Sequence, residues 1–285
     1  MIDVSSWEKD FRIKGSGTRS KYWLKKPSDF SEKASKYLFK LPTEGTGGHW
    51  AEYIASEIGK GIGFNTVNVF LAKDSKNIGT ISRNFRLNSS VFYEGGDLFL
   101  GSFSDFDRES LNHYELPNIL NILDNLSLTE EFVFVPVFDT LIANNDRHCD
   151  NWGVLQQQDF IKLAPIYDNG SSLGFNVKPS KMSQMLTDNR MLEGFCNRGK
   201  SCIGLPQKKK PKHFQLLLYL QEEYPHTIKE AMELVNNLNV NLILKVLNTI
   251  PNEVMSDLEK SWVQHLLMYR KKWILNWYER SANYE

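Results

Sequence analysis

Hydrophobic and polar positions follow two different patterns along the chain, and the change comes near Phe85. Before it, short segments rich in aromatic and β-branched residues are separated by Gly, Pro, Ser or Asn, which is typical of strands and turns. These segments are KYWLKK, KYLFKLP, NTVNVFLA and NIGTISRNF. Between the second and the third, Trp50, Ile54 and Ile58 recur at helical spacing, with glycines on both sides. The pattern predicts a small sheet that carries one helix.

Longer helical patterns follow Phe85. In LTEEFVFVPVFDTLIAN, Ser127 and Glu130 have the spacing of a capping box, and Pro136 predicts that the helix either begins near it or kinks there. The tail, residues 213–284, has a helical pattern throughout. A strand-rich first part and a helical second part together predict an α+β fold.

Composition narrows the classes of function. The 34 Lys and Arg residues balance the 34 Asp and Glu residues, so net charge indicates neither a nucleic-acid partner nor docking to a membrane. Three cysteines without a CxxC pair favour a reducing compartment over a disulfide framework or a zinc cluster. The first residues lack a secretory signal pattern, and no apolar run approaches the ~18 residues of a membrane span. We expect a soluble cytoplasmic protein with no membrane partner and no direct nucleic-acid partner.

Acidic and amide side chains gather in two loops around a predicted hairpin. A helix is expected to end near Asn144, NDRHCDN follows as a loop, WGVLQQQDFIKLAPI predicts a hairpin that turns at the glutamines, and YDNGSS is the next loop. Loops that flank a hairpin lie side by side, so Asp146 and Asn151 should come next to Asp168. Such oxygen ligands suit Mg²⁺, which usually completes its coordination shell with substrate phosphates. The alternative is a pair of Asx turns that satisfy their own backbone.

A second group of candidate residues lies in the strand-rich part. Lys40 stands inside the otherwise apolar segment YLFKLP, where an ammonium group requires a partner, and Glu52 on the predicted helix could supply it. A strand lysine paired with a helix glutamate is how kinases hold nucleotide phosphates. The alternative is an edge-strand lysine whose ammonium group reaches solvent. Upstream, Gly15, Ser16 and Gly17 predict a loop that covers phosphates.

In the order of these motifs the chain resembles the HipA-type serine/threonine kinases. The resemblance rests on YLFKLP, AEYIA, NNDRHCDNWGVL and APIYDNGSSL. It implies that Asp146 is the catalytic base, that Asn151 and Asp168 hold Mg²⁺, that Lys40 contacts the phosphates of ATP, and that Glu52 orients Lys40.

The same resemblance implies a two-lobed protein-kinase-like fold. The small β-rich N-lobe with one helix would span residues 1–86, and the larger, mainly helical C-lobe would span residues 87–285, with the hinge near GTISRNFRL. The implied activity is ATP- and Mg²⁺-dependent phosphorylation of a protein substrate by a toxin-like regulator. An antitoxin or other regulatory partner is also implied. We do not find the extra N-terminal subdomain with which full-length HipA contacts its antitoxin, which puts neutralisation by such a partner in doubt.

Some HipA-type kinases phosphorylate a serine in the loop that corresponds to KGSGTRS, so the resemblance suggests autophosphorylation at Ser16, Thr18 or Ser20. Two alternatives to a protein kinase stay open. One is a kinase of lipid or small-molecule hydroxyls, because phosphatidylinositol kinases share the D-R-H-x-x-N motif. The other is a catalytically inactive interaction module.

Some residues near the two loops have no definite role in the sequence. His148 is expected either to bond a backbone carbonyl or the Asp168 region, or only to pack; Asp150 is expected to be a solvated carboxylate rather than a substrate contact. Arg147 is left open, and so is Cys149, whose reactivity would need a lowered pKa. The run QKKKPK at 207–212 predicts a solvated loop more readily than a nucleic-acid contact.

Overall fold

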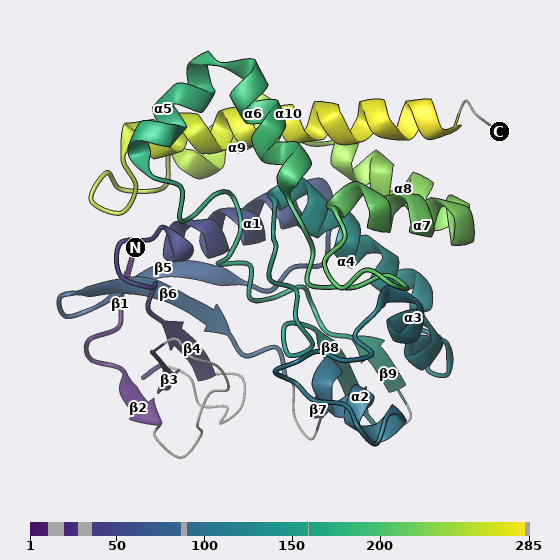
Figure 1. The fold of residues 1–285 in the computed structure, drawn as a ribbon. Coiled ribbons are helices and arrows are strands. Elements are labelled where there is room, and N and C mark those ends of the chain that lie inside the picture. The colour runs from purple at the N-terminus through teal and green to yellow at the C-terminus, as the bar shows by residue number, and fades with distance from the viewer. Residues whose placement is uncertain (11–19, 28–35, 87–89, 159, 283–285) are drawn as a thin grey trace.

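The strand-rich part forms a curled six-stranded sheet (Figure 1). The structure, a computed structural model, describes residues 1–10, 20–27, 36–86, 90–158 and 160–282. Across the sheet the strands are β1 (Ile2–Asp3), β5 (Val69–Asp74), β6 (Asn77–Arg83), β4 (Lys36–Lys40), β3 (Lys21–Lys25) and β2 (Glu8–Asp10). All neighbours are antiparallel except β1 and β5. The four predicted strand segments are therefore confirmed as β3, β4, β5 and β6.

The predicted helix is α1 (Gly48–Ile62), which packs against β5 and β6. Its apolar stripe of Trp50, Ile54 and Ile58 is fully buried, because these positions face the sheet and the helices beyond it. The helix ends at Gly63, whose φ of 108° needs a glycine and lets its N–H bond back to the last turn. In Figure 1, α1 lies between the sheet and the upper helices.

A second, three-stranded antiparallel sheet holds the predicted hairpin. It consists of β7 (Val91–Glu94), β8 (Gly153–Gln157) and β9 (Phe160–Leu163), in that order. The hairpin β8–β9 turns at Gln158, which has a φ of 52°, so the turn at the glutamines is confirmed. Strand β7 was not predicted, because its four residues are too few for a strand pattern to separate from the helices expected after Phe85.

The remaining described elements are helices. They are α2 (Gly95–Ser102), α3 (Leu116–Asp124), α4 (Thr129–Ile142), α5 (Pro179–Thr187), α6 (Asn189–Arg198), α7 (His213–Glu223), α8 (Pro225–Asn236), α9 (Val240–Leu247) and α10 (Asp257–Ala282). Helices α7 to α10 confirm the predicted helical tail. Helix α4 lies at the centre, against α3, α7, α8 and α10. Within the described part of the chain, no helix combines the length and the apolar character that crossing a bilayer requires.

The start of α4 differs from the predicted capping box. Its N-cap is Leu128, without a side-chain cap, and Ser127 has a φ of 56°, so Ser127 is in the preceding turn and caps nothing. Pro136 lies inside the helix, which continues through it to Ile142. Of the two predicted alternatives, a helix that begins near Pro136 is therefore wrong.

Helix α10 is tied to the segments on both sides of the hairpin by two buried side chains. Trp262 Nε1 donates to the carbonyl of Leu173 at 3.0 Å, and Arg270 Nε donates to the carbonyl of Thr140 at 2.6 Å. Thr140 stands in the last turn of α4, just before the NDRHCDN loop, and Leu173 follows the YDNGSS loop. Both loops therefore rest on α10.

Candidate active site

A pocket of about 340 Å³ opens between the two sheets. Its lining comes from β3, β4, β6 and β7, from the segment 82–86, and from both loops around the hairpin. Of the predicted site residues it includes Lys40, Asn151 and Asp168. Lys21 and Asp168, which are 147 residues apart in the chain, therefore meet at one cavity.

Lys40 lies between two carboxylates at the end of β4. Its Nζ is 3.1 Å from Asp168 Oδ2 and 3.7 Å from Glu52 Oε1. Lys40 is 8% exposed and Glu52 is 2% exposed, so neither charge is well hydrated and each requires the other. The predicted pairing of a strand lysine with a helix glutamate is present, and the alternative of a lysine that reaches solvent is wrong.

Asn151 and Asp146 are joined within the NDRHCDN loop. Asn151 Nδ2 donates to the backbone carbonyl of Asp146 at 2.6 Å, which leaves the amide oxygen of Asn151 as its atom for the pocket. Asp146 is half-buried, and its Oδ2 accepts a hydrogen bond from Ser171 Oγ at 3.1 Å. Asp146 does not line the pocket itself, whereas His148, Asp150 and Asn151 of the same loop do.

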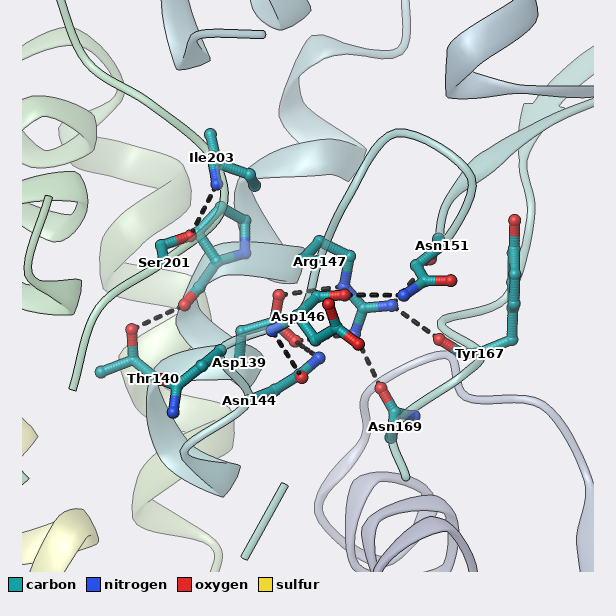
Figure 2. Close-up of polar contacts among 12 residues, drawn as sticks. Asp139, Thr140, Asn144, Asp146, Arg147, Asn151, Tyr167, Asn169, Ser201 and Ile203 are labelled. Atoms are coloured by element: carbon teal, nitrogen blue, oxygen red, sulfur yellow. Dashed lines mark hydrogen bonds and ion pairs between the residues drawn. The ribbon is translucent and has the colours of Figure 1, made fainter. Parts of the chain in front are cut away.

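Arg147, for which the sequence indicated no role, lies between the two loops and joins them (Figure 2). It is 1% exposed and forms a two-pronged ion pair with Asp139 of α4, at 2.9 and 2.7 Å. It also donates to the carbonyls of Asn151 at 2.7 Å and Tyr167 at 2.6 Å, and to Asn169 Oδ1 at 2.7 Å. Burial opposes its charge, but the Asp139 carboxylate more than offsets this and holds the pKa of Arg147 above its usual value.

The hydrogen bonds of Arg147 determine the orientation of the Asp168 side chain. Its φ of 55° is left-handed, a conformation that Asp tolerates better than most residues. Arg147 holds the residue on either side of it, Tyr167 and Asn169. The backbone is thereby fixed where the Asp168 carboxylate meets Lys40. No sequence pattern marks Arg147 for this role, because the partners of its side chain are spread over four separate positions.

Asp150 is not a solvated carboxylate, contrary to the prediction. Its Oδ1 lies 2.5 Å from Arg108 Nη1, and Arg108 also pairs with Glu94 at 2.9 Å and Asp97 at 2.5 Å. This ion-pair cluster ties the NDRHCDN loop to β7 and α2. His148 Nδ1 accepts the backbone N–H of Asp150 at 3.3 Å, so its described bond is with the loop itself.

Two further side chains bear on the chemistry of the site. Burial and the neighbouring Asp150 carboxylate raise the pKa of the Cys149 thiol to about 12, so this cysteine is a protonated packing residue. Lys21 of β3 faces Lys40 across the ladder and lines the pocket. Burial, and then the charge of Lys40, lower the pKa of Lys21. Lys21 was not predicted as a site residue, although its place opposite Lys40 in paired strands could have indicated it.

The predicted phosphate-covering loop precedes β3. Gly15, Ser16 and Gly17, together with Thr18, lie outside the described residues. The segment expected as the hinge does line the pocket, at positions 82–86. Next to it, the rings of Phe85, Phe92 and Tyr167 pack together, with centroids 5.3 to 6.1 Å apart, and form an apolar wall.

A family model described as the HipA-like C-terminal domain matches residues 13–237. The chain belongs to this family. The HipA-like region therefore includes Lys40, Glu52, Asp146, Asn151 and Asp168. The chain is also similar to the serine/threonine-protein kinase CtkA of Helicobacter pylori (strain J99 / ATCC 700824). The two are 24% identical over 241 residues, which cover 81% of this chain and 72% of the relative.

Two solved structures share the fold of this HipA-like chain. The crystal structure of a Helicobacter pylori proinflammatory kinase CtkA matches with a TM-score of 0.82 at 21% identity, over 100% of this chain and 98% of the other. HipA from the Shewanella oneidensis MR-1 complex with HipB and operator DNA matches with a TM-score of 0.67 at 12% identity, over 96% of this chain and 67% of the other. The predicted two-lobed α+β fold is confirmed, and the family and the CtkA relative support a kinase as the enzyme class.

Proposed function

We propose that this HipA-like chain is an ATP- and Mg²⁺-dependent protein serine/threonine kinase. The observation that carries the proposal is Lys40, which lies between Glu52 and Asp168 at the wall of a pocket that Asn151 also lines. Kinases hold nucleotide phosphates with a strand lysine that a helix glutamate orients. Lys21 adds a second positive charge on the same wall, and the rings of Phe85, Phe92 and Tyr167 offer an apolar surface for a nucleotide base.

We assign residues 1–86 to the N-lobe and residues 87–285 to the C-lobe. The six-stranded sheet ends at Arg83, and the next described strand, β7, pairs with β8 of the second sheet. The pocket is lined from both parts, with the segment 82–86 between them. This arrangement supports a hinge at 82–86.

The donors in the pocket fit Mg²⁺. Asn151 offers its amide oxygen, because Asp146 engages its amide nitrogen, and Asp168 offers a carboxylate in the same cavity. Hard oxygen donors of this kind suit Mg²⁺ better than zinc. We propose that Asn151 and Asp168 hold the ion, which when bound neutralises charge on the phosphates.

Asp146 is the proposed catalytic base. Ser171 orients its carboxylate, which has capacity to accept a second hydrogen bond from the hydroxyl of a substrate serine or threonine. The hydroxyl proton then passes to the Asp146 carboxylate as the oxygen attacks the terminal phosphate of ATP, and the bond from that phosphate to ADP breaks so that ADP leaves. Lys40, in contact with the phosphates, orients ATP for this attack.

Asp146→Asn tests this assignment. Asparagine keeps the shape but replaces an acceptor-only carboxylate with a partly donating amide, so kcat should fall by about 10²-fold or more while ATP affinity stays close to that of the parent. Labelled ATP with cell extract measures transfer, and calorimetry measures nucleotide affinity. Asp124→Asn, at the exposed end of α3, is the control and should behave like the parent. If Asp146→Asn keeps activity within a few-fold of the parent, Asp146 has a structural role only. If the label from ATP appears in lipids or small molecules, the acceptor is not a protein.

The wild type and Asp146→Asn also test autophosphorylation of the predicted phosphate-covering loop, KGSGTRS. Ser16 and Thr18 lie outside the described residues, but the carbonyl of Ser20 accepts the N–H of Leu41 at 3.1 Å, so the end of the loop borders Lys40. A phosphate there would add about 1.5 to 2 negative charges where Lys40 receives ATP, and would switch the enzyme off. Mass spectrometry after ATP treatment should find the modified peptide in the wild type and not in Asp146→Asn. An unmodified loop in active enzyme would contradict this self-regulation.

By similarity to the Shewanella HipA in its complex with HipB, we also propose that this chain is a toxin-like regulator with an antitoxin or other regulatory partner. The three free cysteines of this chain support the proposal of a reducing, cytoplasmic location. Affinity purification of the tagged chain from its own cells tests the partner, because a stable antitoxin would co-purify in fixed proportion.

A further inference from the structure

A run of lysines lies beside the NDRHCDN loop, which is called the catalytic loop below because it carries the proposed base Asp146. Residues 199–212, called the basic segment below, contain five lysines and no acidic residue, although the whole chain has equal numbers of both charges. Lys200, Lys208, Lys209 and Lys210 are exposed, and none of them forms an ion pair with the described residues. The basic segment therefore presents several positive charges that the described part of the protein does not neutralise.

The basic segment is fastened to Asn145, the residue before Asp146. The thiol of Cys202 donates to the carbonyl of Asn145 at 3.0 Å, and His213 Nε2 lies 3.0 Å from Asn145 Oδ1. His213 is buried, and burial lowers its pKa to about 3, so the imidazole is neutral at physiological pH and its Nε2–H donates to Asn145. The bond of Cys202 holds the basic segment against the catalytic loop, and the bond of His213, the first residue of α7, holds the residue that follows the segment.

A second connection passes through Tyr114. The N–H of Gly204 donates to the carbonyl of Tyr114 at 3.0 Å, and the Tyr114 hydroxyl donates to the carbonyl of Arg147 at 2.9 Å. Figure 2 shows Ser201 and Ile203 beside the residues around Asp146. The basic segment thus contacts the catalytic loop directly through Asn145 and indirectly through Tyr114.

The basic segment is also held by its own backbone. The N–H of Ser201 donates to the carbonyl of Pro211 at 2.9 Å, which closes the loop at its base. Leu205 and Lys208 exchange two backbone hydrogen bonds, of 2.9 and 2.8 Å, which fix the turn before Lys209 and Lys210. A surface that is ordered before it binds loses less conformational entropy on binding.

Electrostatics agree with this placement. Burial is the main reason why the pKa of the Cys202 thiol rises to about 11, while the carboxylate of Asp146 raises it further and the ammonium group of Lys210 lowers it. The charges of Asp146 and Lys210 thus both reach this thiol, which lies between the catalytic loop and the basic segment.

We infer that the basic segment is the docking surface for the protein substrate, and that it selects a serine or threonine flanked by Asp or Glu residues. This inference rests on the proposed kinase function and adds the class of substrate. Charge complementarity favours an acidic segment, since unpaired lysines attract carboxylates and reject basic sequences. A peptide is favoured over nucleic acid because the segment that carries the lysines is bonded to Asn145, the neighbour of the base proposed to receive the substrate hydroxyl.

The test uses two fluorescent peptides of equal length with one central serine, flanked by acidic residues in one and by basic residues in the other. Fluorescence anisotropy with the full chain and a non-hydrolysable ATP analogue should show the acidic peptide binding at least ~10-fold more tightly at low salt. The triple variant Lys208→Gln, Lys209→Gln, Lys210→Gln should weaken this binding by about 10-fold, because each exposed charge contributes modestly. Equal binding of the two peptides would overturn the inference.

A matched control makes the same change of charge elsewhere. Lys76, Lys229 and Lys245 are exposed and form no ion pair with the described residues, so replacing all three with Gln should leave peptide affinity unchanged. The same loss in both triple variants would overturn docking at the basic segment. Thermal unfolding and ATP affinity check that each variant is folded.

Binding and turnover separate the two hypotheses. Lysine-dependent binding of the acidic peptide without any phosphate transfer would preserve the docking surface and contradict the kinase proposal. Equal phosphorylation of both peptides would support the kinase proposal and contradict docking at the basic segment. An RNA oligonucleotide of the same net charge is tested as a competing ligand. If it binds more tightly than the acidic peptide and depends equally on Lys208 to Lys210, the partner of the basic segment is a nucleic acid and the inference is wrong.

Discussion

Asp168→Ala is expected to remove phosphoryl transfer and to weaken Mg²⁺-dependent ATP binding. The substitution deletes one of the two proposed protein ligands of the ion, so phosphates and water would hold it almost alone. It also deletes the carboxylate 3.1 Å from Lys40 Nζ, which leaves Glu52, at 3.7 Å, as the described ion-pair partner of Lys40. Both the ion and the lysine would lose the geometry in which they meet the phosphates.

Calorimetric titration with ATP, with and without Mg²⁺, measures the binding part of this prediction, and transfer from labelled ATP measures turnover. Asp124→Ala removes an exposed carboxylate outside the pocket and serves as the matched control. The assigned metal site is wrong if Asp168→Ala turns over as fast as Asp124→Ala. It is also wrong if Mg²⁺ improves ATP binding equally in both variants.

Arg147→Met is expected to lower the free energy of unfolding by about 3–5 kcal/mol, because it leaves the buried Asp139 carboxylate without its cation. Methionine retains much of the apolar volume of arginine, so the lost charge and hydrogen bonds dominate the effect. The loss would also release the backbone around Asp168. Activity should therefore fall even at temperatures where the variant is folded.

Chemical denaturation of the single and double variants measures this effect. Adding Asp139→Asn to Arg147→Met removes the uncompensated charge, while an oxygen is kept for Asn144, which donates to Asp139 Oδ1 at 2.9 Å. The double variant should therefore be more stable than Arg147→Met alone. A loss below ~1 kcal/mol in the single variant, a value typical of exposed ion pairs, would show that the buried network contributes little.

The parts of the fold that the sequence predicted are those with local, repeated patterns. Helix α1, strands β3 to β6 and the hairpin β8–β9 each carry their own periodicity or turn residues, so neighbouring positions determine them. Strand β7 was missed because it has four residues and becomes a strand only by pairing with β8, about 60 positions later in the chain. The capping box at Ser127 failed because the turn before α4 places that residue at a positive φ.

The candidate site divides in the same way. Lys40 and Glu52 were found because a charged residue in an apolar strand requires a partner, and the next helix supplies one. Arg147 and the Arg108 cluster were not found, because their partners come from helices, loops and strands that only the folded chain brings together. For a single arginine in a polar loop, no sequence pattern distinguishes a buried side chain with several hydrogen-bond partners from a solvated one.

The anchoring of both loops on α10 has a consequence for the newly made chain. Arg270 binds the carbonyl of Thr140, and Trp262 binds that of Leu173, although 130 and 89 residues separate the partners. These contacts can form only after α10 has left the ribosome, when Lys40, Asp146 and Asp168 have long been synthesised. Nascent chains that lack α10 would carry the proposed chemical groups without their support, so kinase activity would begin only after α10 has been synthesised.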